Sequence, residues 1–125
     1  MKHARAFGVV GSIALVVGSL WSYHHLDLRE PMRTRDLLAR FERGDISAWD
    51  EYKMDPPRSS RAMPALIEGF RSASEVVRER AIVGACGLPR NEVVAESLRR
   101  LVQDQAISVR KAAEHCLAYD YRGYP

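Results

Sequence analysis

The chain has 125 residues, enough for one domain of ordinary size. Its net charge is +3, but Lys2 and Arg5 account for two of its 19 basic residues, which leaves 17 basic against 16 acidic residues after residue 23. A nearly neutral body with interleaved charges is a solvated surface and not a basic stripe, so we expect no nucleic-acid partner.

The first predicted element is a hydrophobic helix near the N-terminus. No charged residue occurs from Ala6 to Tyr23, and as a helix these 18 residues span roughly 27 Å, close to the bilayer hydrocarbon thickness of about 30 Å. Trp21 and Tyr23 stand at its end, where aromatic residues prefer the headgroup level. We predict that residues 6–23 cross a lipid bilayer and that residues 1–30 form a membrane anchor of the signal-anchor type.

The same segment has the length of a signal peptide, so cleavage is the alternative. No Ala-x-Ala site follows it, and Ser19 and Ser22 are flanked by bulky side chains. The net charge of the flanking segments favours a cytoplasmic N-terminus, although the count of Lys and Arg on the two sides does not settle the orientation. We predict a single-pass protein of a bacterial inner membrane, with its C-terminal domain on the extracytoplasmic side.

Small residues gather on one face of this predicted membrane helix. Such a face lets a second transmembrane helix approach closely, although Gly and Ser are also simply frequent in membrane segments. The candidate packing face consists of Gly8, Gly11, Ser12, Gly18 and Ser19.

Residues 31–59 are predicted to form a pair of short helices and a proline-rich loop. Pro31 is expected to end the preceding helix, because proline cannot continue the backbone ladder. A helix over residues 33–43 is closed by Gly44, and Asp45 is placed to cap a second helix with Ile46, Trp49 and Tyr52 on its buried side. The paired prolines at 56 and 57 indicate a loop.

Four more helices are predicted between residue 60 and the tyrosine-rich tail at 119–125. The third helix opens near residues 60–63 and the fourth follows a turn at 72–74. Gly87 and Pro89 stop the fourth helix, Asn91 caps the fifth, and the sixth begins after residue 105. The apolar faces of the last three include Val76, Val93 and Ile107. No run shows strand alternation, so the body is predicted to be all-α.

An internal repeat supports this organisation. When the chain is shifted by 32 residues, apolar positions and the Val-Arg dipeptides coincide without a gap. The matched pairs are Leu66 with Leu98, Phe70 with Val102, Val77 with Val109, Arg78 with Arg110 and Ala81 with Ala113. Each unit is a helical hairpin that cannot bury its apolar face alone, so we expect the hairpins to stack.

The repeated segments resemble the HEAT repeat, in the short form of the phycobilisome-lyase-like group. The resemblance covers residues 60–119 and rests on Val77-Arg78-Glu79-Arg80-Ala81, Val109-Arg110-Lys111-Ala112-Ala113 and Met63-Pro64-Ala65-Leu66-Ile67. It implies a short α-solenoid, with two repeats in residues 60–125 and residues 31–59 as a capping pair. It also implies an inter-repeat ladder in which Arg78 or Arg110 pairs with Asp104. Ser72 stands where the first repeat should have its aspartate, and Glu96 replaces the first-helix proline.

The polar residues form no recognisable catalytic or metal-binding pattern. The two cysteines, Cys86 and Cys116, have no zinc or redox-motif spacing, and Cys86 aligns with Ala118 and not with Cys116. Buried free thiols are therefore favoured over a disulfide. No phosphate-binding loop, nucleophile elbow or triad can be drawn. We expect no enzyme activity, no cofactor and no metal.

We expect instead a membrane-anchored HEAT-like protein–protein interaction module, a scaffold or accessory subunit of a larger membrane-associated complex. Arg, Trp and Tyr are enriched at binding hot spots. The candidate partner contacts are Trp49, Arg80, Arg99, Arg100, Tyr121 and Tyr124. Two alternatives stay open: a lyase-like chromophore-handling protein, which would need an accessible reactive cysteine, and a secreted soluble binding domain left by signal-peptide cleavage.

Overall fold

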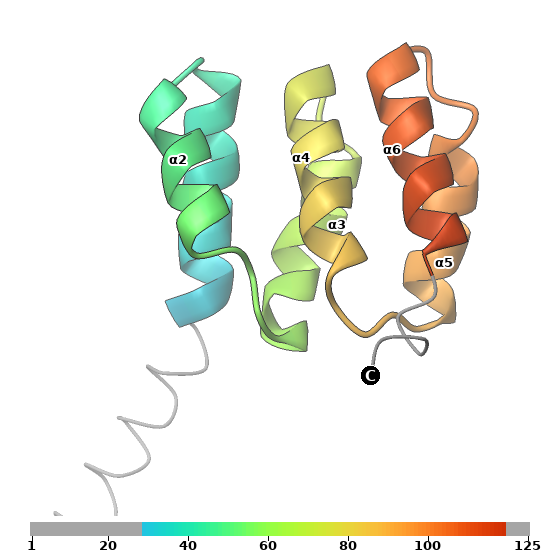
Figure 1. Cartoon of the computed structure of the whole chain (residues 1–125), viewed down its shortest axis with the longest axis horizontal. Helices are drawn as coiled ribbons and strands as arrows, with labels where there is room; N and C mark the ends of the chain where they lie inside the picture. The colour runs from blue at the N-terminus through green and yellow to red at the C-terminus, as the bar shows by residue number, and fades with distance from the viewer. Residues whose placement is uncertain (1–28, 120–125) are drawn as a thin grey trace, which may run out of the picture.

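The computed structural model describes residues 29–119, and this part of the chain is all-helical, with no strand (Figure 1). A first helix covers residues 29–42. It is followed by α2 (Ile46–Met54), the 3-10 turn η1 (Ser60–Ala62), α3 (Met63–Phe70), α4 (Glu75–Cys86), α5 (Glu92–Leu101) and α6 (Ile107–Ala118). The predicted fold class is confirmed at the level of an all-α body.

Local side-chain chemistry explains where several helices begin. Asp45, Ser74 and Asn91 each stand in extended backbone before a helix and accept a hydrogen bond from an N–H of its first turn. Gly44 has a φ of 75°, the left-handed conformation that glycine adopts without strain, and it turns the chain from the first helix into α2. Pro64 lies in the first turn of α3, where its missing N–H costs no hydrogen bond.

The helices form three hairpins that lie side by side (Figure 1). α2, α4 and α6 make one layer, and the helix over residues 29–42, α3 and α5 make the other. α4 packs directly on α6, and each of α3 and α5 packs on the second helix of its own hairpin. Tyr52 of α2 connects the first hairpin to the second, because its hydroxyl donates to the carbonyl of Arg80, 2.9 Å away.

One continuous apolar core runs through the three hairpins. Its most deeply buried large side chains come from every hairpin: Leu37, Leu66, Ile82, Leu88, Leu98, Val94, Val109 and Cys116. The 32-residue shift matches core positions, since Leu66 and Leu98 are both fully buried. Ala81 and Ala113 are also both fully buried.

Two details of the sequence prediction are wrong. Pro31 does not end a helix, because residues 29–42 are continuously helical and Pro31 lies near the start of the described stretch. Ile46, Val76, Val93 and Ile107 were assigned to buried faces but are 81%, 41%, 63% and 60% exposed. All four occupy the first or second position of their helices. The third residue of each of these helices is buried (Ala48, Val77, Val94 and Val109), so the first turns do pack. The four exposed residues stand one or two positions earlier, about 100–200° around the helix, and point to solvent.

The described residues contain no helix that is both long and apolar enough to cross a membrane. The predicted membrane span at residues 6–23 and its packing face lie outside the described residues.

Candidate functional site

An arginine–aspartate pair joins the second and third hairpins. Arg78 Nε lies 2.9 Å from one carboxylate oxygen of Asp104 and Arg78 Nη2 lies 3.0 Å from the other. The two side chains are only 16% and 12% exposed. These bidentate hydrogen bonds are the main cause that lowers the pKa of Asp104. The family resemblance implies either Arg78 or Arg110 as the partner of Asp104 in the inter-repeat ladder. The structure forms the pair between Arg78 and Asp104.

Arg78 and Arg110 hold the turn before their helices in the same way. Arg78 Nη1 donates to the carbonyls of Ser72 and Ala73, at 2.9 and 3.1 Å. Arg110 Nη1 donates to the carbonyls of Asp104 and Gln105, at 2.9 and 3.2 Å. These acceptors lie 32 residues apart in sequence, as the two arginines do.

The turns themselves match as well. The Ser72 hydroxyl accepts from the N–H of Ser74 at 3.1 Å, and the Asp104 carboxylate accepts from the N–H of Ala106 at 2.9 Å. Serine at position 72 keeps this local turn but is too short and uncharged to hold an arginine of the preceding hairpin. One repeat earlier, the position of Arg78 is occupied by Ile46. The first and second hairpins therefore have neither the arginine nor the aspartate of such a pair.

Two of the predicted partner contacts, Trp49 and Arg80, pack on each other. The Arg80 guanidinium lies 3.7 Å from the centroid of the Trp49 ring, while Lys53 Nζ lies 4.6 Å from the same ring. Trp49 also stacks near Tyr52 and packs against the core. The Nε of Arg80 is buried and has no hydrogen-bond partner within the described structure. These two residues therefore join the first hairpin to the second, and only part of each reaches solvent.

Arg99 and Arg100 remain on the surface, on the outer side of α5. Arg99 Nη1 contacts Glu92 at 2.9 Å and Glu96 at 3.0 Å. Arg100 Nε lies 3.6 Å from Glu96 and the Arg100 side chain is 79% exposed. Val93 adds an exposed apolar side chain to the same helix. The predicted contacts Tyr121 and Tyr124 lie outside the described residues.

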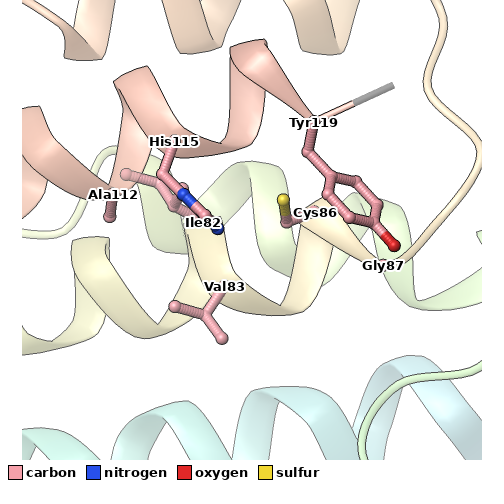
Figure 2. Close-up of a pocket in the computed structure, with 7 residues that line it drawn as sticks. All are labelled: Ile82, Val83, Cys86, Gly87, Ala112, His115 and Tyr119. Atoms are coloured by element: carbon pink, nitrogen blue, oxygen red, sulfur yellow. The ribbon is translucent and has the colours of Figure 1, made fainter. Parts of the chain in front are cut away.

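A small apolar cavity lies between α4 and α6. It has a volume of about 250 Å³, and Figure 2 shows the residues that line it: Ile82, Val83, Cys86, Gly87, Ala112, His115 and Tyr119. Cys86 is half-buried and Cys116 is buried; both are free thiols. The neighbouring Cys116 thiol lowers the pKa of Cys86 to about 7, and the Cys86 thiol together with burial raises the pKa of Cys116.

The sequence did not predict this contact between the thiols. The 32-residue register aligns Cys86 with Ala118, and this alignment does not place Cys86 beside Cys116. Equivalent residues of stacked hairpins are separated by a helix-to-helix spacing of about 8–10 Å, so the residues that touch are those that face each other across the seam. The described residues contain no cluster of three or more His, Cys, Asp or Glu side chains that could hold a metal ion.

No protein-family model, no curated protein and no solved structure matches the chain. The resemblance to the HEAT repeat therefore rests on the residues and contacts of this chain alone.

Proposed function

We propose that the chain is a membrane-anchored protein–protein interaction module of the HEAT type, acting as a scaffold or accessory subunit of a membrane-associated complex. In this proposal the three hairpins are a short α-solenoid, with residues 31–59 as the capping pair. Residues 6–23 hold it in a bilayer, through a single pass of a bacterial inner membrane, with the helical domain on the extracytoplasmic side.

The repeated turn geometry is the observation that carries the proposal. Arg78 and Arg110 make the same pair of carbonyl contacts in consecutive hairpins, and Asp104 joins one hairpin to the other. Hairpins that repeat in this way stack laterally and expose extended helical faces, which repeat proteins use to bind other proteins.

The outer face of α5 is the proposed contact surface. Val93, Glu96 and Arg100 are exposed and recur at helical spacing, so they lie along one side of the helix. Arg99 and Arg100 face nearby glutamates, which makes this surface mixed in charge. An apolar residue among paired charges suits a protein surface of complementary charge better than a polyanion.

The test is purification of the tagged full-length protein in mild detergent, followed by identification of what co-purifies and a reciprocal purification from the partner's side. We expect Val93→Asp and Arg100→Glu to lose the partner. The control is Lys111→Glu, which reverses an exposed charge on α6. A partner kept by all three variants would refute the α5 surface, and the absence of any reciprocal partner would refute the interaction role.

The anchor is tested separately. We expect the full chain to stay in carbonate-washed membranes with its N-terminal residues present by mass spectrometry, and a mature chain starting after residue 19 would favour the secreted alternative. Replacing Gly11 and Gly18 by Leu tests the packing face; unchanged association of the full chain would remove it.

The chromophore-handling alternative needs an accessible cysteine, and Cys86 lines the cavity between α4 and α6. The cavity of about 250 Å³ is smaller than the roughly 300–1,000 Å³ of ordinary ligand pockets, which favours the interaction role.

A further inference from the structure

Cys86 and Cys116 come from neighbouring helices of the same layer. α4 packs directly on α6, and Cys86 packs against the core cluster to which Cys116 belongs. Cys86 lines the same cavity as Ala112, His115 and Tyr119, which lie on either side of Cys116 in the sequence, so the two cysteines stand at the same level of the seam. Each thiol is also the largest influence on the pKa of the other, which requires them to be close. A disulfide requires this approach of two side chains from adjacent backbones.

We propose that Cys86 and Cys116 form a dithiol site that reacts reversibly with low-molecular-weight disulfides and closes a disulfide between α4 and α6. The site is independent of the proposed interaction role, because it needs only the seam between the two helices.

The two thiols differ in solvent exposure and therefore in their roles in the reaction. Cys86 lines the cavity, whereas Cys116 is 1% exposed. The position next to Cys86 is open, because a Cβ added at Gly87 would meet no atom within 4 Å. A small disulfide can therefore reach Cys86 and not Cys116.

The charges around the site favour a thiolate at Cys86. Arg90 acts on the thiol through its positive charge, and its guanidinium is held near α6 by a hydrogen bond that it donates to the carbonyl of Tyr119. His115 of α6 and Tyr119, the residue after α6, also face the cavity (Figure 2). The pKa of Cys86, about 7, leaves a large thiolate fraction at neutral pH.

The reaction proceeds by two exchanges. The Cys86 thiolate attacks one sulfur of the small disulfide, forms a mixed disulfide and releases one thiolate. The released thiolate takes the proton of the Cys116 thiol, whose sulfur then attacks Cys86 Sγ, breaks the mixed disulfide and releases the second thiolate. Two protein thiols are oxidised by two electrons, and the small disulfide is reduced to two thiols.

The test uses the full-length protein in mild detergent with bis(2-hydroxyethyl) disulfide, a small neutral reagent. After acid quenching, free thiols are alkylated under denaturing conditions and the intact mass is measured. We expect loss of two hydrogen atoms and of both alkylation sites, recovery of both thiols with dithiothreitol, and a higher melting temperature for the oxidised protein. Peptide mapping at early times should find the mixed disulfide on Cys86.

Two variants provide the control. Cys116→Ala should accumulate the mixed disulfide at Cys86, and Cys86→Ala should leave Cys116 free. The inference is overturned if the mixed disulfide forms first on Cys116 in the unmodified protein, or if the native chain closes the disulfide no faster than the chain unfolded in urea. The early-time mapping decides the question even where a variant fails to fold.

Discussion

The contact between Gly84 and Tyr52 offers a sharp test of how the first hairpin docks on the second. A Cβ placed at Gly84 would lie 2.1 Å from the Tyr52 hydroxyl oxygen and 3.0 Å from Cδ2 of Leu66. Tyr52 is buried, 3% exposed, and donates to the carbonyl of Arg80. Gly84→Ala therefore forces the phenol out of its place.

The magnitude follows from three contributions. Overpacking costs about 1–3 kcal/mol, and displacement of the Tyr52 hydroxyl costs about 1 kcal/mol for its hydrogen bond. Alanine gains about 1 kcal/mol over glycine in a helix interior. We expect Gly84→Ala to lower the free energy of unfolding by about 1–3 kcal/mol.

The matched background is Tyr52→Phe, which removes the clashing oxygen. The nearest remaining atom of that ring lies 3.4 Å from the added Cβ, an ordinary contact. In this background the added Cβ still meets Leu66 Cδ2 at 3.0 Å, so Gly84→Ala should cost less than in the parent, by at least about 1 kcal/mol. Urea unfolding of the four chains, followed by helical circular dichroism, measures this. Equal destabilisation in both backgrounds, or none in the parent, would refute the reasoning.

Three further predictions concern the arginine–aspartate pair and the thiols. Because Arg78 holds the pKa of Asp104 below its ordinary 3.8, the carboxylate stabilises the fold above that pH and this contribution is lost as the pH falls through the lowered folded value. Acid titration of stability should therefore show a smaller fall for Asp104→Asn than for the parent below about pH 4, and identical acid limbs would contradict this. Arg78→Ala should destabilise by about 1–3 kcal/mol in urea. Arg110→Ala should cost less, because Arg110 donates to two carbonyls and acts on the Asp104 carboxylate only through its charge. An equal or larger loss would contradict the pairing of Arg78 with Asp104. Cys86 should react with iodoacetamide at a half-maximal rate near pH 7, and Arg90→Gln should move that midpoint upward; an unmoved midpoint would exclude Arg90 as a cause.

Helix type and several helix starts could be predicted because their causes are local. Asp45 and Asn91 cap their helices through their own side chains and the next few N–H groups. The buried positions recur at helical spacing and repeat after 32 residues, so Leu66 and Leu98 were assigned correctly to the core.

Exposure at four helix starts was predicted wrongly, because apolar residues there were assigned to the buried side by residue type. Ile46 and Ile107 stand two residues before the buried Ala48 and Val109, about 200° around the helix, so they point to solvent. The helical period itself indicates this direction, because Arg110, Lys111 and Glu114 follow Ile107 on the same face.

The contacts between hairpins depend on tertiary geometry. The Arg78–Asp104 pair was expected through the family resemblance, not from spacing alone. Neither the contact between Trp49 and Arg80 nor the one between the thiols was predicted, because the repeat register identifies equivalent residues and not the residues that face one another.

A double-mutant cycle between Arg78→Gln and Asp104→Asn tests the link between the repeated hairpins most directly, with urea unfolding as the measurement. The two side chains are in bidentate contact and nearly buried. We expect a coupling energy of about 1–3 kcal/mol. Additivity of the two single changes within about 0.5 kcal/mol would show that the hairpins are not joined through this pair.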